Sequence, residues 1–155
     1  MTALETSVVH RIASVEAMED FGGGLTARLR GGSVIFLRGD LGSGKTTLVR
    51  GLLGALGYEG VVPSPTFTLL ETYDVRGLKV AHLDLYRLDG ATELEQLAIR
   101  DYLGEQSVLL VEWPERAEDG LPPADCEVHI AIDEDGARTV RLESRTRMGE
   151  GFCTG

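Results

Sequence analysis

Several residue types are scarce or missing in this sequence. The 155 residues include only two cysteines, Cys126 and Cys153, which lack CxxC spacing. This number excludes a disulfide framework and a thiolate metal site, so we expect free thiols. Asparagine is absent, and the only lysines are Lys45 and Lys79.

Long apolar runs are also missing. No stretch of eighteen apolar residues is present, so we expect no membrane span. The N-terminal sequence MTALETSVVH has no basic region followed by an apolar stretch. It does not resemble a signal peptide, and we expect a cytoplasmic protein.

Positive charge is scarce relative to negative charge. Fifteen Lys and Arg residues stand against 25 Asp and Glu residues, for a formal net charge of −10. An acidic surface repels phosphate backbones, which argues against direct binding to nucleic acid independent of its sequence. If the protein serves a nucleic-acid pathway, we expect another protein to make those contacts.

The length and the hydrophobic pattern predict one α/β domain over residues 1–145, followed by a flexible tail at 146–155. Hydrophobic residues make up 43% of the chain, enough for a core. A mainly parallel central sheet flanked by helices should end in an antiparallel C-terminal hairpin around Asp135-Gly136. Expected helices cover 14–30, 44–56 and 91–103, and expected strands cover 5–12, 34–37, 78–86 and 107–113, with another beginning near Phe67.

One short segment, GDLGSGKT, matches the phosphate-binding pattern G-x-x-x-x-G-K-[ST] in full. It follows an apolar strand and opens a helix, as a P-loop requires. Backbone N–H groups would face phosphate oxygens, Lys45 would reach the β- and γ-phosphates, and the Thr46 hydroxyl would ligate Mg²⁺. The expected nucleotide-binding residues of this segment are Asp40, Leu41, Gly42, Ser43, Gly44, Lys45, Thr46 and Thr47.

The missing asparagine bears on the choice of base. Guanine-specific P-loop proteins usually read the base with an Asn/Thr-Lys-x-Asp motif. Lys79 lies in Gly-Leu-Lys-Val and cannot serve in such a motif. ATP is therefore favoured over GTP.

Two predicted strands end in a carboxylate. Asp84 closes KVAHLD and Glu112 closes SVLLVE, and a P-loop site needs such an acid to hold Mg²⁺ directly or through water. Either acid could instead face solvent, and Glu112 could orient the attacking water. His82 shares a strand face with Asp84, where it could sense the γ-phosphate or be a buried histidine.

Two further residues are candidates near the phosphates. Thr66 lies in the hydroxyl-rich segment 64–68, at the position of a nucleotide switch, although an ordinary Ser-Pro turn would look the same. Trp113 follows Glu112 and could be a packing residue or a platform for the base.

Together these motifs resemble the TsaE family, the small P-loop ATPases of bacterial tRNA threonylcarbamoyladenosine biosynthesis. The resemblance rests on GDLGSGKTTLVRG, SPTFTLLETY, HLDLYRL, ELEQLAIRDYL and VEWPER, and it covers roughly residues 14 to 133. Ala98 stands where the family often has glycine, and Met18 stands where many members have threonine. No side chain for base recognition is therefore carried over at position 18.

The resemblance implies a P-loop NTPase fold, binding of ATP and Mg²⁺, and two protein partners, TsaB and TsaD. TsaD transfers the threonylcarbamoyl group to an adenosine beside the tRNA anticodon, at position 37, so tRNA is reached only through the complex. Carried over by motif, residues 42–47 would cradle phosphate, Thr46 and Glu112 would bind Mg²⁺, and Asp84 would support the metal or the water. Thr66 would belong to the switch-like loop, and Trp113 would lie near the site.

The sequence leaves two other functions open, a small-molecule P-loop kinase and a nucleotide-gated binding module with negligible turnover. A kinase usually carries a lid with several arginines, whereas the candidate insert here is largely acidic. For the ATPase, the expected catalytic residues are Lys45, Asp84 and Glu112. No arginine finger can be assigned, so we expect slow turnover alone and stimulation by a partner. The oligomeric state stays open.

Overall fold

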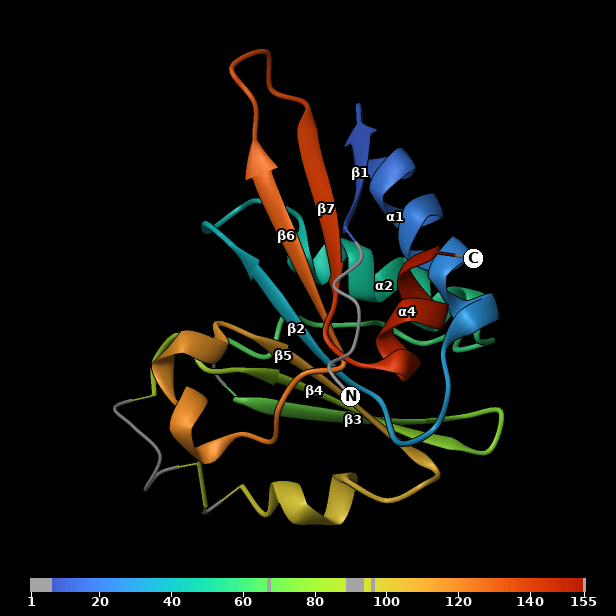
Figure 1. Cartoon of the computed structure of the whole chain (residues 1–155), viewed down its shortest axis with the longest axis vertical. Helices are drawn as coiled ribbons and strands as arrows, with labels where there is room; N and C mark the ends of the chain where they lie inside the picture. The colour runs from blue at the N-terminus through green and yellow to red at the C-terminus, as the bar shows by residue number, and fades with distance from the viewer. Residues whose placement is uncertain (1–6, 67, 89–93, 96, 155) are drawn as a thin grey trace.

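The structure, a computed structural model, describes residues 7–66, 68–88, 94–95 and 97–154. It contains one seven-stranded sheet in the order β1-β7-β6-β2-β5-β4-β3 (Figure 1). The strands are β1 Ser7–Ile12, β2 Val34–Gly39, β3 Leu70–Val75, β4 Leu78–Asp84, β5 Ser107–Glu112, β6 Cys126–Ile132 and β7 Arg138–Ser144. The α-helices are α1 Val15–Gly24, α2 Lys45–Ala55 and α4 Arg147–Thr154, and the short 3₁₀ helices are η1 Leu25–Arg28, η2 Ile99–Tyr102, η3 Pro114–Arg116 and η4 Glu118–Gly120.

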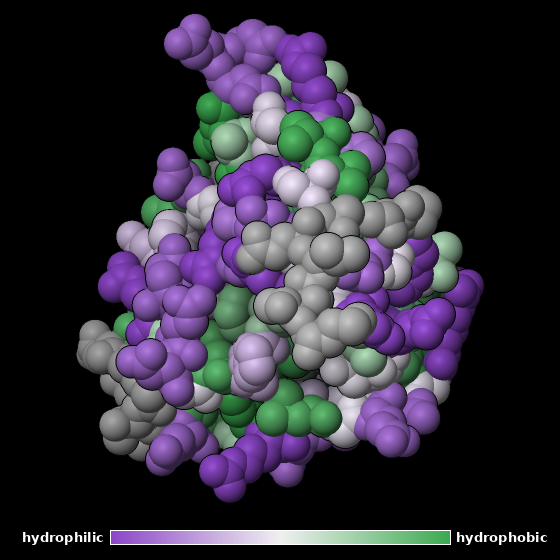
Figure 2. Space-filling model, viewed as in Figure 1, coloured by the Kyte–Doolittle hydropathy of each residue, from purple (hydrophilic) through white to green (hydrophobic). Residues whose placement is uncertain are grey.

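The centre of the sheet is parallel and both of its edges are antiparallel. Strand β2 pairs in parallel with β5 and β6, and β4 pairs in parallel with β5. The predicted antiparallel hairpin is β6–β7, and its tip is hydrophilic in Figure 2, at the top of the view. The mainly parallel centre, the helical flanks and the C-terminal hairpin are confirmed. The described part of the strand expected at 5–12 is the edge strand β1, which pairs with β7, and residues 5 and 6 lie outside the described residues.

A second hairpin, β3–β4, was not predicted. Its two-residue turn is Arg76-Gly77, with φ of 47° and 77°. Such a turn requires left-handed backbone at both positions, for which Asn-Gly or Asp-Gly is the usual signal. Arginine supplies no such signal, so the pattern of the sequence did not indicate the turn.

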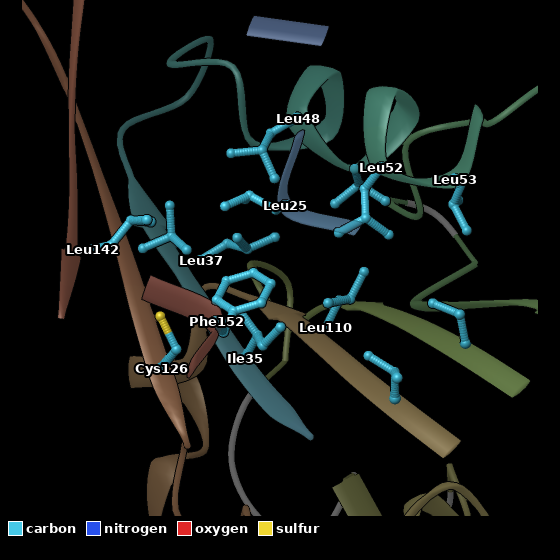
Figure 3. Close-up of a cluster of buried hydrophobic side chains, with 14 of the residues drawn as sticks. Leu25, Ile35, Leu37, Leu48, Leu52, Leu53, Leu110, Cys126, Leu142 and Phe152 are labelled. Carbon is cyan, nitrogen blue, oxygen red and sulfur yellow. The ribbon is translucent and has the colours of Figure 1, made fainter. Parts of the chain in front are cut away.

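The two faces of the sheet pack into two apolar clusters. Strand β2 is buried on both faces, as its continuous run of apolar residues predicted. Helices α1, α2 and α4 cover one face, where Leu37 and Leu48 belong to one cluster (Figures 1 and 3). Phe36 and Leu109 belong to the cluster on the opposite face.

Helices α1 and α2 pack closely through glycine. A Cβ atom placed on Gly22 would lie 2.1 Å from the Leu48 carbonyl oxygen, so only glycine fits there. This close packing explains one of the three consecutive glycines in the predicted helix 14–30. The α-helix itself ends at Gly24 and continues as the 3₁₀ helix η1.

The C-terminal segment differs from the sequence prediction. Residues 146–155 were expected to be flexible, but Arg147–Thr154 form helix α4. Phe152 and Cys153 are buried, and Figure 3 places the Phe152 ring inside the cluster beneath α2. Three apolar residues in a glycine-rich segment were too few to establish a helical period, which is why the sequence did not predict the helix. Cys126 and Cys153 are free thiols, as expected, with their sulfur atoms 3.0 Å apart.

Two other predicted elements are only partly described. Helix 91–103 falls in part on residues outside the described ones, and its described part is interrupted because Ala98 is left-handed, with φ of 52°, and Ile99–Tyr102 is a 3₁₀ helix. The strand expected near Phe67 begins at Leu70, and Phe67 itself lies outside the described residues. Within the described residues, no helix has the length and apolar character to span a membrane.

Candidate functional site

The glycine loop connects the end of β2 to the start of α2. Gly42 and Gly44 have φ of 79° and 116°, a left-handed backbone that glycine adopts without strain. Gly44 is the N-cap of α2, so the loop delivers the chain directly to a helix N-terminus. The free N–H groups and the helix dipole at that end favour an anion.

Arg138, at the start of β7, holds the loop from outside. Its Nε donates to the Ser43 carbonyl oxygen at 2.9 Å, and its Nη2 donates to the Gly42 carbonyl oxygen at 3.1 Å. A single guanidinium therefore fixes two successive carbonyls of the loop. Only the tertiary pairing of β7 brings this residue to the loop, and no motif marks it, so the sequence did not predict its role.

Lys45 is buried in the loop, with 5% of its surface exposed. Its ammonium group donates to the Gly39 carbonyl oxygen and lies 4.1 Å from the centre of the Trp113 ring. Burial lowers the pKa of Lys45 below its ordinary value, and the nearby carboxylates of Glu112 and Asp84 act in the opposite direction. The site thus keeps a cation and two acids within one small volume.

The two predicted acids lie side by side. Asp84 and Glu112 are register partners at the ends of the parallel strands β4 and β5. They are 4% and 3% exposed, so the alternative that they face solvent is wrong. Asp84 accepts hydrogen bonds from Thr66 Oγ1 at 3.2 Å and from the Tyr86 backbone N–H at 3.0 Å.

Glu112 has two side-chain donors on one oxygen. Its Oε2 accepts a hydrogen bond from Thr46 Oγ1 at 3.0 Å, and it lies 2.5 Å from His82 Nε2. His82 has no exposed surface, so of the two alternatives it is the buried histidine.

The remaining predicted residues close the site from two sides. Thr66 is hydrogen-bonded to Ser64, with the two hydroxyl oxygens 2.8 Å apart. Trp113 has a φ of 56°, an uncommon conformation for a bulky residue that is typical of functional sites. Its ring packs against Tyr86, with the centroids 4.9 Å apart.

One cavity, which we call the phosphate cavity, brings most of these residues together. Its volume is about 210 Å³. It is lined by Leu41, Gly42, Ser43, Gly44, Lys45, Thr46, Thr47, Ser64, Thr66, Asp84, Glu112 and Trp113. Of the residues predicted for the site, only Asp40 is not among them.

A second cavity, which we call the flanking cavity, lies on the other side of the loop. It measures about 230 Å³ and shares Gly42, Ser43, Gly44 and Thr47 with the phosphate cavity. Its other walls are Ile12, Ala13, Ser14, Val15, Met18, Gly136 and Arg138. These residues come from both ends of the sequence, so no local pattern predicted the cavity.

The family model for TsaE, described as threonylcarbamoyl adenosine biosynthesis protein TsaE, matches residues 12–140. The chain belongs to the TsaE family. This is a family of threonylcarbamoyladenosine biosynthesis proteins, and the matched range contains both cavities. Helix α4 lies beyond that range.

Individual TsaE proteins and one solved structure agree with this assignment. The chain is 46% identical over 121 residues to the tRNA threonylcarbamoyladenosine biosynthesis protein TsaE of Haemophilus influenzae, covering 78% of this chain and 76% of that protein. It is 38% identical over 143 residues to the TsaE protein of Streptomyces coelicolor, covering 88% and 95%. The crystal structure of Bacillus subtilis YdiB superimposes with a TM-score of 0.83 at 28% identity, over 98% of this chain and 95% of that one.

Proposed function

We propose that this TsaE-family protein binds and hydrolyses Mg-ATP, and that it acts on the TsaB–TsaD complex in tRNA threonylcarbamoyladenosine biosynthesis. The observation that carries the proposal is the phosphate cavity. There, a P-loop with its lysine and threonine faces two buried carboxylates at the ends of adjacent parallel strands. This is a combination that recurs in enzymes of phosphoryl transfer.

Backbone and side-chain groups of the P-loop would bind the triphosphate together. The loop N–H groups and the α2 N-terminus would bind phosphate oxygens, and Lys45 would leave the Gly39 carbonyl to bind the β- and γ-phosphates. Trp113 would exclude water from the Lys45 side of the cavity, because its ring already covers the ammonium group.

The donor set fits Mg²⁺. The Thr46 hydroxyl can ligate a cation through its lone pair while donating its proton to Glu112 Oε2. Mg²⁺ usually binds proteins through one or two carboxylates and takes its other ligands from phosphate and water. The ion would neutralise charge developing on the phosphates. Glu112 would hold it, and Asp84 would hold its water or the attacking water.

The flanking cavity would hold the nucleoside. It begins where the phosphate cavity ends, at the shared residues 42–44, and its apolar walls include Ile12 and Met18. An adenine ring fits an apolar slot of this kind, and the loop would place the α-phosphate between the two cavities. This arrangement supports a complete nucleoside triphosphate as the ligand.

The acidic surface supports a protein partner in place of direct tRNA binding. With a net charge of −10, the chain repels a polyanion. Family membership points to TsaB and TsaD as the complex on which the ATPase acts. ATP binding would order the segment around Ser64 and Thr66 through the metal and the γ-phosphate, and hydrolysis would release it.

The test is phosphate release from Mg-ATP by the purified chain, alone and then with the TsaB–TsaD complex and tRNA. We expect slow release alone, stimulation by the complex, and loss of both in Lys45→Ala. ATP binding without stimulation would contradict the partner assignment. Transfer of phosphate to a metabolite in an acceptor screen would identify a kinase instead.

A further inference from the structure

We propose that His82 is a positioning residue, which fixes the Glu112 carboxylate in the orientation that the metal site needs. The inference rests on the proposed function, because it assigns Glu112 to a Mg²⁺ ion. It concerns a residue beneath the site, with no exposed surface of its own.

His82 occupies a place where an apolar residue would be expected. Along β4, Val80 and His82 lie on the same face, and Val80 belongs to the cluster beneath α1 and α2. A buried polar ring costs stability unless it is hydrogen-bonded. Among the described residues, the one side chain hydrogen-bonded to His82 is Glu112, so this contact accounts for a histidine at the position.

The contact also defines the tautomer. Glu112 Oε2 lies 2.5 Å from His82 Nε2, and a carboxylate oxygen can only accept. The proton is therefore on Nε2, and the ring donates to the acid. Nδ1 has no hydrogen-bond partner among the described residues, so the contact with Glu112 is the one described hydrogen bond of the ring.

Both described side-chain donors to Glu112 converge on the same oxygen. Thr46 Oγ1 donates to Oε2 from α2, and His82 Nε2 donates to it from β4. With Oε2 held from two elements, the carboxylate plane is fixed and Oε1 is left for the metal or its water. Without His82, the one remaining hydrogen bond from a described side chain would come from Thr46, whose hydroxyl would also ligate the ion.

A histidine that only fills space would behave differently. Its replacement by another side chain of suitable size would change stability but not the affinity for Mg²⁺. Outer partners of metal ligands typically change metal affinity by about 10- to 100-fold. Metal affinity, measured apart from turnover and stability, therefore separates the two roles.

Two polar variants test this. In His82→Gln the side-chain amide can donate from about the position of Nε2, whereas in His82→Asn the amide is too short to reach Glu112. The readout is the fluorescence of Trp113, the single tryptophan, which lines the phosphate cavity. Mg²⁺ is titrated at fixed ATP, and ATP is titrated separately in EDTA. Thermal unfolding shows how much of each variant is folded.

We expect His82→Asn to raise the half-saturating Mg²⁺ concentration by about 10- to 100-fold and His82→Gln to raise it by less than about 3-fold, with ATP affinity in EDTA unchanged in both. The matched control is His129→Asn, which removes a similar contact, His129 Nε2 to Glu143 Oε2 at 3.0 Å, outside the site. It should leave Mg²⁺ dependence unchanged.

Equal Mg²⁺ dependence in folded His82→Asn and the wild type would overturn the proposal, as would an equal loss in the Gln and Asn variants. If the wild-type protein itself gave no Mg²⁺-dependent response to ATP, the proposed function would fail first, and the positioning role with it. If the Asn variant does not fold, full Mg²⁺ affinity in folded His82→Leu would overturn the proposal, and a 10-fold loss there with a near-normal Gln variant would support it.

Discussion

A Cβ atom on Gly51 of α2 would lie 2.0 Å from the carbonyl oxygen of Glu19 in α1. The two helices therefore meet backbone to backbone at this point. Gly54, one turn further along the same helix, has nothing within 4 Å of its Cβ position. Packing therefore requires glycine at position 51, whereas position 54 has room for a side chain.

We expect Gly51→Ala to lower the free energy of unfolding by about 1 to 3 kcal/mol, because the helices must move apart to admit a methyl group. Gly54→Ala should raise it by about 0.5 to 1 kcal/mol, because alanine is the better helix former and has no clash there. Urea denaturation of both variants measures the difference. Equal stabilities would mean that α1 and α2 separate at little cost.

Helix α4 should contribute to the stability of the whole domain. Phe152 is 4% exposed and packs in the main cluster, so Phe152→Ala should lower the free energy of unfolding by about 3 to 5 kcal/mol. Met148→Ala, at a position 36% exposed on the same helix, should cost less than about 1 kcal/mol. Thermal and denaturant unfolding would distinguish the two. If Phe152→Ala were as stable as the wild type, helix α4 would not stabilise the domain, and the prediction of a flexible tail would be favoured again.

Tyr73 should make stability fall in alkaline solution. Burial, with smaller contributions from Glu71 and Tyr58, raises the pKa of Tyr73 from 10.0 to about 12. Between these values the folded state holds the proton and the unfolded state loses it, so the free energy of unfolding falls as pH rises. The slope from this group is at most about 1.4 kcal/mol per pH unit.

The matched variant for this prediction is Tyr73→Phe, which keeps the ring packed against Tyr58 at a centroid distance of 4.8 Å. We expect its stability to fall less steeply than that of the wild type between pH 10 and 12, as measured by urea denaturation across that range. Parallel curves for the two proteins would show that the Tyr73 hydroxyl titrates normally.

Arg138 should support nucleotide binding through the loop that it holds. Removing its two hydrogen bonds to the loop in Arg138→Ala should weaken ATP binding by about 10-fold, since bonds to charged groups contribute about 1.5 to 3 kcal/mol. Arg138→Lys should not restore it, because an ammonium group lacks the planar fork. Arg141→Ala, on the same strand but paired with Glu143, is the control. Trp113 fluorescence reports each affinity, and full affinity in Arg138→Ala would refute the role.

The sequence predicted what local patterns encode. The P-loop is a contiguous motif, and Asp84 and Glu112 end two apolar strands, so their meeting at one sheet edge followed from the parallel arrangement. The role of Arg138 depends on which strand lies beside the loop, and that information is absent from residues near 138. Helix α4 was not predicted for a related reason. Phe152 and Cys153 are buried because they pack in the main cluster, and the residues around them in the sequence do not indicate that contact.

The strand order has a consequence for how the chain is made. Strand β1 pairs only with β7 in the described sheet, so the first strand synthesised has no partner until the last strand has left the ribosome. The flanking cavity has the same dependence, because it joins residues 12–18 to residues 136 and 138. A nascent chain with a complete P-loop would still lack Gly136 and Arg138, which line the cavity proposed to hold the nucleoside. Closure of β1 onto β7 is a contact between distant parts of the chain, of the kind that slows folding, and nucleotide capture would follow that closure.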